Sequence, residues 1–168
     1  SYQLKNKAND YYVTPKSDGI RMIGYVHSSG QIFLLGSKDK YFQPTKYTFD
    51  SQYAGTIFDG EFITNDKSQT PIAHYLVFDC YYHNNTDIRQ KNLVYRRNIA
   101  KEIIESSASN EPLNQNILFK IILKNFIPLK PDTFHSACQS CFNEIDSDIY
   151  ENDGLIFTPI DKVGGNDL

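Results

Sequence analysis

Short apolar runs separated by polar turns dominate the first half of the chain, a pattern that is typical of β-strands. Residues 20–27 and 31–36 are two such runs, and the His-Ser-Ser-Gly segment that joins them predicts the turn of a β-hairpin. Residues 56–63 predict a further strand, and residues 74–82 are apolar enough to predict a strand buried on both faces. Residues 37–54 are polar and irregular, so we expect a connection without regular structure there.

A change of period in the middle of the chain predicts a helix. Tyr95, Ile99 and Ile103 recur at four-residue spacing, which places them on one helical face. Thr86 and Asp87 precede this repeat and are residue types that cap helix N-termini. We therefore expect a helix of roughly twenty residues that begins after them.

The remainder of the chain mixes strand and helix signals. Residues 117–126 return to strand character, and residues 131–146 begin with a Pro-Asp pair that can start a second helix. Residues 153–160 predict a last strand, and residues 162–167 predict a loop. Helices and strands do not alternate regularly, so the pattern predicts a sheet-rich α+β fold rather than a doubly wound one.

Composition narrows the class of protein. The 168 residues are enough for one domain with a real core, and we assign residues 1–168 to a single domain. The net charge of −3 gives no general electrostatic attraction for nucleic acid. No apolar run approaches the length of a membrane span, so we expect no membrane partner. Three cysteines do not make a disulfide framework, which favours a reducing, intracellular compartment.

The residues that can carry chemistry are charged residues and glycines near the ends of predicted strands. The sequence contains no G-x-x-x-x-G-K-[ST] loop, no G-x-G-x-x-G fingerprint and no G-x-S-x-G elbow. The remaining motifs are Lys16-Ser17-Asp18-Gly19-Ile20-Arg21, Asp59-Gly60-Glu61, Phe78-Asp79 and Asp153-Gly154. Each motif alone is most often a simple turn, so only their combination and order carry information.

In this order, K-x-D-G-x-R, F-D-G-E, Y-L-V-F-D and D-G-L-I-F resemble the motif series of the covalent nucleotidyltransferase superfamily. That superfamily comprises the mRNA capping guanylyltransferases and the ATP-dependent DNA and RNA ligases. The resemblance runs from about residue 11 to residue 159. D-G-L-I-F-T-P at 153–159 is similar to the capping form, since ligases more often have glutamate first, and K-N-F at 124–126 also resembles a capping-enzyme strand. The implied nucleotidyltransferase fold has two antiparallel sheets flanked by helices, with a nucleotide groove between the sheets.

The resemblance implies that Lys16 is the catalytic nucleophile. A free lysine has a pKa of about 10.4, so cationic neighbours or desolvation must lower that pKa before the amine can attack. In the family the amine attacks the α-phosphate of GTP, pyrophosphate leaves, and a lysyl-N–GMP intermediate forms. The GMP then passes to the 5′-diphosphate end of an RNA.

Other site residues are carried over by position. Arg21 is expected to contact ribose or phosphate, because its planar fork holds two acceptors at once. Phe78 is expected to stack on the base, and Lys124 to contact the phosphates or the base edge. Asp153 is expected to bind Mg²⁺ or Mn²⁺, which prefer hard oxygen ligands, and Glu61 to hydrogen-bond the ribose or to help place that cation. The remaining expected nucleotide-binding residues are Thr14, Asp18, Gly19 and Lys38.

The sequence departs from the family pattern in two places. Lys38 stands where capping enzymes often have arginine, which keeps the charge but not the bidentate grip. The final motif with two lysines, and the OB-fold domain that follows it, would lie beyond Leu168. We therefore expect this chain to be part of a longer protein that has further capping-enzyme domains or subunits as partners. The composition suits a large DNA virus, with a cytoplasmic site in a viral factory or virion, or a lower eukaryote, with a nuclear one.

Two alternative functions stay open. An ATP-dependent polynucleotide ligase domain would use the same Lys16 with adenine, and a non-catalytic module would bind nucleotides or RNA ends without an adduct.

A basic stretch on the first predicted helix comprises Arg89, Lys91, Arg96, Arg97 and Lys101. It can face RNA phosphates, but a solvated face with pairs such as Asp87–Lys91 and Lys101–Glu105 is the commoner arrangement.

Overall fold

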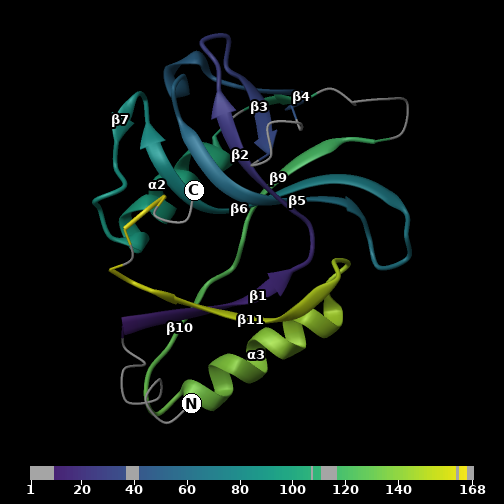
Figure 1. The fold of residues 1–168 in the computed structure, drawn as a ribbon, viewed down its shortest axis with the longest axis vertical. Coiled ribbons are helices and arrows are strands. Elements are labelled where there is room, and N and C mark those ends of the chain that lie inside the picture. The colour runs from purple at the N-terminus through teal and green to yellow at the C-terminus, as the bar shows by residue number, and fades with distance from the viewer. Residues whose placement is uncertain (1–9, 37–41, 107, 111–116, 162, 166–168) are drawn as a thin grey trace.

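Two β-sheets of unequal size form the protein, as the computed structural model shows for residues 10–36, 42–106, 108–110, 117–161 and 163–165 (Figure 1). The smaller sheet has the strand order β10-β1-β11 and is antiparallel throughout. Its strands are β1 (Tyr11–Ser17), β10 (Ile127–Pro128) and β11 (Asn152–Pro159).

The larger sheet has the order β7-β6-β5-β2-β3-β4-β8, and β9 pairs with β6 in parallel. Its strands are β2 (Ile20–Val26), β3 (Gln31–Gly36), β4 (Phe42–Phe49), β5 (Ile57–Asn65), β6 (Pro71–His83), β7 (Thr86–Asp87), β8 (Ala108–Asn110) and β9 (Phe119–Leu123). A short 3-10 helix, η2 (Ser51–Tyr53), follows β4. The sheet-rich α+β class is therefore confirmed, with one parallel pair added to the expected antiparallel sheets.

Each sheet is covered by one helix. Helix α2 (Leu93–Glu105) packs on β6 and β9 of the larger sheet, and α3 (Phe134–Ser147) packs on β1 of the smaller one (Figure 1). The main apolar core lies in the larger sheet, whereas a separate small core joins Val13 and Leu129 to Ala137 and Cys141 of α3. In the described part of the chain, neither helix is long and apolar enough to cross a membrane.

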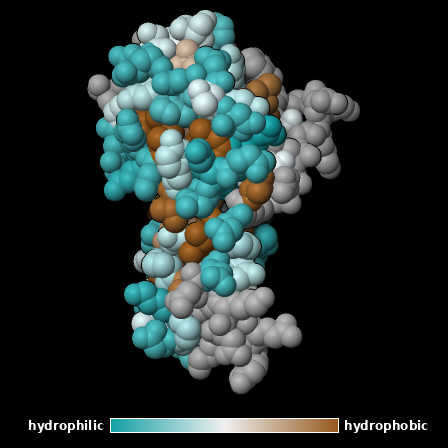
Figure 2. Space-filling view, turned by 90° about the vertical axis from the view of Figure 1, so that its left-hand side faces the viewer, coloured by the Kyte–Doolittle hydropathy of each residue, from teal (hydrophilic) through white to brown (hydrophobic). Residues whose placement is uncertain are grey.

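The chain crosses between the sheets at two places that matter for the site. Asp18 and Gly19 join β1 directly to β2. A Cβ on Gly19 would lie 2.7 Å from the carbonyl oxygen of Phe62 and 2.9 Å from Cγ of Glu61, so only glycine allows this close approach to β5. The second crossing runs from β9 to β10. Figure 2 shows the junction of the two sheets as a waist where apolar side chains are exposed.

Most predicted elements are confirmed, and the β2–β3 hairpin pairs Val26 with Ile32 as expected. Three predictions were wrong. Residues 42–49 form β4 rather than an irregular connection, because they pair with β3 and β8. Thr86 and Asp87 pair with β6 as β7, and the helix begins later, where the side chain of Asn92 accepts from the N–H of Tyr95. Only the first part of 117–126 is a strand, since the chain leaves the larger sheet after Leu123.

Candidate active site

Lys16 and Asp153 face each other across the paired strands β1 and β11. The Lys16 ammonium donates to both carboxylate oxygens of Asp153, at 2.7 and 2.6 Å, and both side chains are about half exposed. This hydrogen bond raises the pKa of Lys16 and lowers that of Asp153. The lowered pKa that an attack on phosphorus requires is not present in this state, because the nearest charged group is an acid.

Lys124 approaches the same segment from the other side. It follows β9, and its ammonium donates to the carbonyl of Pro15 at 2.6 Å and to the hydroxyl of Ser17 at 3.0 Å, the two residues that flank Lys16. Burial lowers the pKa of Lys124 to about 8. Of the two lysines, Lys124 is thus the more easily deprotonated, although the exposed Lys16 is the expected nucleophile.

Arg21 is fixed by a buried acid. Its guanidinium donates to Asp59 at 3.2 Å from Nε and at 2.7 Å from Nη2, and Asp59 is fully buried. The Tyr81 hydroxyl donates to the same carboxylate. This pairing raises the pKa of Arg21, and the guanidinium stands 6.0 Å from the ring centre of Phe78. Arg21 remains 37% exposed, so it can reach a ligand while Asp59 holds it.

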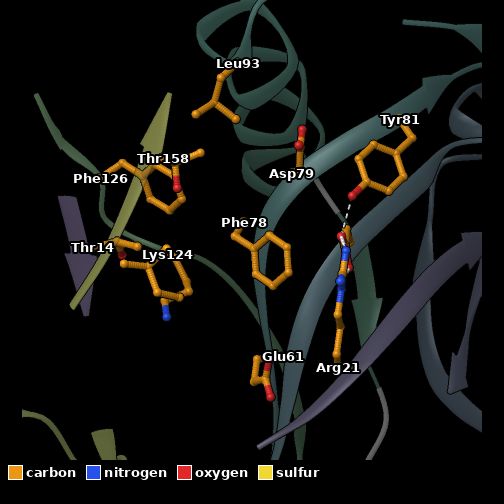
Figure 3. A pocket seen from close by; sticks show the side chains of 12 residues that line it. Thr14, Arg21, Glu61, Phe78, Asp79, Tyr81, Leu93, Lys124, Phe126 and Thr158 are labelled. Carbon is orange, nitrogen blue, oxygen red and sulfur yellow. Dashed lines mark hydrogen bonds and ion pairs between the residues drawn. The ribbon is translucent and has the colours of Figure 1, made fainter. Parts of the chain in front are cut away.

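These residues surround a cavity of about 250 Å³ at the junction of the two sheets (Figure 3). The lining residues are Thr14, Arg21, Asp59, Glu61, Phe78, Asp79, Tyr81, Leu93, Lys124, Phe126, Ile156 and Thr158. Phe78 points into the middle of the cavity and is only half-buried, so it is not a core aromatic. Lys16 is not a lining residue. The lining residue Lys124 contacts Pro15 and Ser17, which flank Lys16, so Lys16 stands beside the cavity at its rim.

Comparison with known proteins decides the family. The profile of the mRNA capping enzyme catalytic domain matches residues 3–165. The chain belongs to the mRNA capping enzyme catalytic domain family. The mRNA-capping enzyme subunits alpha of Kluyveromyces lactis and Saccharomyces cerevisiae are 27% and 25% identical to this capping-enzyme domain over 95% of its length. The domain spans 39% of each of these relatives.

Solved structures show the same fold at lower identity. The mycobacterial DNA ligase D structure complexed with ATP and MES has a TM-score of 0.61 at 12% identity, covering 91% of the capping-enzyme domain and 49% of that chain. The structure titled "Pmar-Lig_Pre." has a TM-score of 0.58 at 14% identity, covering 96% and 41%. The nucleotidyltransferase fold expected from the motifs is therefore confirmed.

The capping-enzyme domain gathers most of the predicted site residues. Thr14, Arg21, Glu61, Phe78 and Lys124 line one cavity. Exposed Asp18 and Gly19, in the link from β1 to β2, do not line this cavity but a separate hollow with Phe62 and Glu151. Lys38 lies outside the described residues.

Asp153 and Glu61 supply some, but not all, of the ligands that a divalent cation needs. Asp153 is exposed, and Glu61 is a half-buried carboxylate whose pKa is raised by burial. Among the described residues, no cluster of three or more His, Cys, Asp or Glu side chains is placed to hold a metal ion. One or two carboxylates are nevertheless what Mg²⁺ uses when substrate phosphates complete its coordination.

Sequence reasoning missed several lining residues of the capping-enzyme domain. Asp59 was noted only as a member of its D-G-E motif, and Tyr81 only as part of a strand; their contact across paired strands left no local signal. Ile156 was noted only as part of the D-G-L-I-F motif, and the structure shows it 41% exposed. It lines the cavity from the smaller sheet, whereas Phe78 lines it from the larger one.

The basic stretch on α2 of the capping-enzyme domain is not a solvated face throughout. Arg96 is fully buried and donates to both carboxylate oxygens of Asp79, at 2.7 and 2.8 Å. Asp87 pairs with Arg89 at 2.7 Å instead of with Lys91. The expected Lys101–Glu105 pair is present at 3.8 Å. Buried Arg96 is therefore a structural residue, because its fork is fully used within the protein.

Proposed function

We propose that this domain transfers GMP from GTP to the 5′-diphosphate end of RNA through a covalent intermediate on Lys16. The observation that carries the proposal is the placement of the Lys16 amine, held by Asp153 at the rim of a cavity lined by Arg21, Glu61 and Phe78. A primary amine beside a half-polar, half-aromatic cavity can attack a phosphate whose nucleoside occupies that cavity.

The geometry assigns a task to each group. Phe78 and Ile156 offer apolar surface from opposite sheets, which suits a planar base, and Arg21 offers donors that are already oriented by Asp59. Lys124 adds a cation to the same cavity. Together these groups bind and orient the nucleotide before any bond changes.

Lys16 must lose a proton before it can attack. In the present state Asp153 holds the amine as an ammonium. Asp153 and Glu61 are the residues that would hold a divalent cation together with the substrate phosphates, and such a cation would supply charge neutralisation at the α-phosphorus. Lys16 becomes easier to deprotonate once Asp153 releases it, because the hydrogen bond from Lys16 to Asp153 is what raises the pKa of the amine.

The covalent step exchanges one bond at phosphorus for another. The neutral Lys16 nitrogen forms a bond to the α-phosphorus, the bond from that phosphorus to the bridging oxygen breaks, and pyrophosphate leaves with the electron pair. The protons that the amine gives up before and during the attack pass to solvent or to the leaving pyrophosphate. In the second step a terminal oxygen of the 5′-diphosphate RNA attacks the same phosphorus, and the phosphorus–nitrogen bond breaks to restore Lys16. The Kluyveromyces lactis and Saccharomyces cerevisiae relatives are each named as a subunit alpha, which supports a further partner subunit for the complete protein.

Adduct formation tests the proposal. The full-length protein is incubated with Mg²⁺ or Mn²⁺ and either α-labelled GTP or α-labelled ATP, then denatured and examined for acid-labile label. We expect label from GTP alone and none in Lys16→Ala, while Lys120→Ala, an exposed lysine on β9, labels like the wild type.

Other results would each overturn the proposal in a defined way. Label from ATP alone would make the protein a ligase-type adenylyltransferase. Label from neither nucleotide in the full-length protein would support a non-catalytic binding module. Undiminished label in Lys16→Ala would place the nucleophile elsewhere.

A further inference from the structure

Arg97 occupies the place where two strands that build the cavity separate. Strands β6 and β9 run in parallel from the pair Ala73–Phe119 to the pair Val77–Leu123. The N–H of Lys124 still donates to the carbonyl of Val77 at 2.8 Å. Beyond that bond β6 continues in the larger sheet, whereas the other strand crosses to β10 in the smaller one (Figure 1).

The Arg97 guanidinium continues the pairing where the backbones can no longer do so. Its Nη1 donates to the carbonyl of Phe78 at 3.0 Å, and its Nη2 donates to the carbonyl of Lys124. These two carbonyls belong to the first residues on each strand after the last ladder pair, Val77–Leu123. A planar fork with two parallel donors is suited to bridge two acceptors at such a divergence.

The Arg97 side chain also contacts Phe126, a further residue that lines the cavity. The Arg97 guanidinium carbon lies 3.8 Å from the ring centre of Phe126, a close cation–π contact. Phe78, Lys124 and Phe126 all line the cavity (Figure 3), whereas Arg97 itself does not. One half-buried side chain from α2 thus contacts three cavity residues that come from two diverging segments.

The energetics of Arg97 differ from those of its neighbour Arg96. Arg96 has a carboxylate partner, Asp79. In the described part of the chain no acid forms an ion pair with Arg97, and burial lowers its pKa to about 10. The charge is still present at neutral pH. The Arg97 guanidinium has carbonyl and ring partners and does not gain the Coulomb attraction of an ion pair. Its role therefore lies in fixing the positions of the groups that it contacts.

We propose that Arg97 is a positioning residue for nucleotide binding, which holds Phe78, Lys124 and Phe126 in register across the divergence of β6 and β9. This inference rests on the proposed function, because it assigns these residues to a nucleotide site. Since Arg97 acts on binding groups and not on Lys16 or Asp153, its loss weakens nucleotide affinity and leaves the chemical step largely intact.

The test compares Arg97→Met and Arg97→Lys with Arg89→Met in the full-length protein. Arg89 is a matched control, because it also stands over an aromatic ring, that of Tyr82 at 5.5 Å, but its side chain is 41% exposed and pairs with Asp87. Adduct formation is measured as a function of GTP concentration, and each variant's unfolding midpoint is recorded.

We expect Arg97→Met to raise the half-saturating GTP concentration by about tenfold or more, with the saturated rate reduced by less than about threefold. Arg97→Lys keeps the charge but not the fork, and falls between Arg97→Met and the wild type. Arg89→Met behaves as the wild type. If Arg97→Met does not fold, Arg97→Lys decides by the same measurements.

An unchanged half-saturating concentration in Arg97→Lys and Arg97→Met would overturn the inference. So would a loss confined to the saturated rate, or a loss that follows the unfolding midpoint alone. If the wild type forms no adduct, the proposed function fails, and calorimetric titration with GTP still tests Arg97. Equal GTP affinity in the wild type and Arg97→Met, or no GTP binding by either, would then refute it.

Discussion

The two sides of the groove hold their charged residues in opposite ways. On the larger sheet Asp59 is fully buried and receives hydrogen bonds from both Arg21 and Tyr81. On the smaller sheet Lys16 and Asp153 form an ion pair whose side chains are 48% and 57% exposed. A buried pair is costly to break and therefore fixes geometry, whereas an exposed pair exchanges partners easily. Arg21 and Asp59 are thus preorganised to bind a ligand. Lys16 and Asp153, in contrast, can change their hydrogen-bond partners.

Removing the buried charge should give the largest effect on stability. We expect Asp59→Asn to lower the free energy of unfolding by about 2 kcal/mol, because Arg21 and Tyr81 both lose the charged, buried acceptor to which they donate. Urea denaturation monitored by circular dichroism measures this change. Asp87→Asn, which removes the acid of an exposed pair, serves as control and should leave the midpoint unchanged. A small change in the free energy of unfolding in Asp59→Asn would show that the pair of Arg21 and Asp59 does not fix the geometry of this side of the cavity.

Removing the exposed charge should spare stability and impair chemistry. We expect Asp153→Asn to leave the unfolding midpoint unchanged and to slow adduct formation by about a hundredfold, the usual effect of losing one group that stabilises the transition state. Single-turnover labelling with GTP measures the rate. A marked loss of stability with a normal rate would reverse the roles that we assign to the two sides.

The pH dependence of binding sharpens the contrast through Lys124. Its native pKa of about 8 is lowered by burial, so the ammonium loses its charge as the pH rises through about 8. If the charged form contacts the nucleotide, GTP affinity should fall about tenfold from about pH 7 to about pH 9. Calorimetric titration across this window measures the fall, and Lys124→Met should show weaker binding without it. A flat profile in the wild type would exclude a role for the Lys124 charge.

The smallest expected effect lies in the third member of the buried network. Tyr81→Phe removes only the hydroxyl that donates to Asp59, while the ring remains in place. We expect a loss of about 1 kcal/mol in the free energy of unfolding, since Arg21 still partners the carboxylate. The two variants Tyr81→Phe and Asp59→Asn, singly and combined, form a double-mutant cycle; strict additivity would show that the groups are not coupled.

The sequence predicted the strands and most of the site because those signals are local. The hairpin of β2 and β3 follows from two apolar runs and a turn, and Lys16, Glu61 and Asp153 follow from motifs of a few residues. The helix start was placed too early at Thr86, because pairing with β6 overrode a good capping signal.

Contacts between residues that are distant along the chain could not be predicted from the sequence. The bond from Arg96 to Asp79 joins residues 17 positions apart, and that from Lys124 to Pro15 joins residues 109 apart. A polar residue on a helix reads as solvent-exposed unless its partner is known, which is why Arg96 and Arg97 were assigned to a solvated face. The ion pair of Lys16 with Asp153, 137 positions further along the chain, was not predictable for the same reason.

The position of the covalent bond is the most direct test of whether Lys16 is the nucleophile. After reaction of the full-length protein with GTP and a divalent cation, peptide mapping by mass spectrometry locates the attached nucleotide. We expect GMP on the Lys16 side chain, released when a 5′-diphosphate RNA is added. GMP attached to Lys124 or to another residue, or a fully active enzyme whose Lys16 carries no nucleotide, would contradict it.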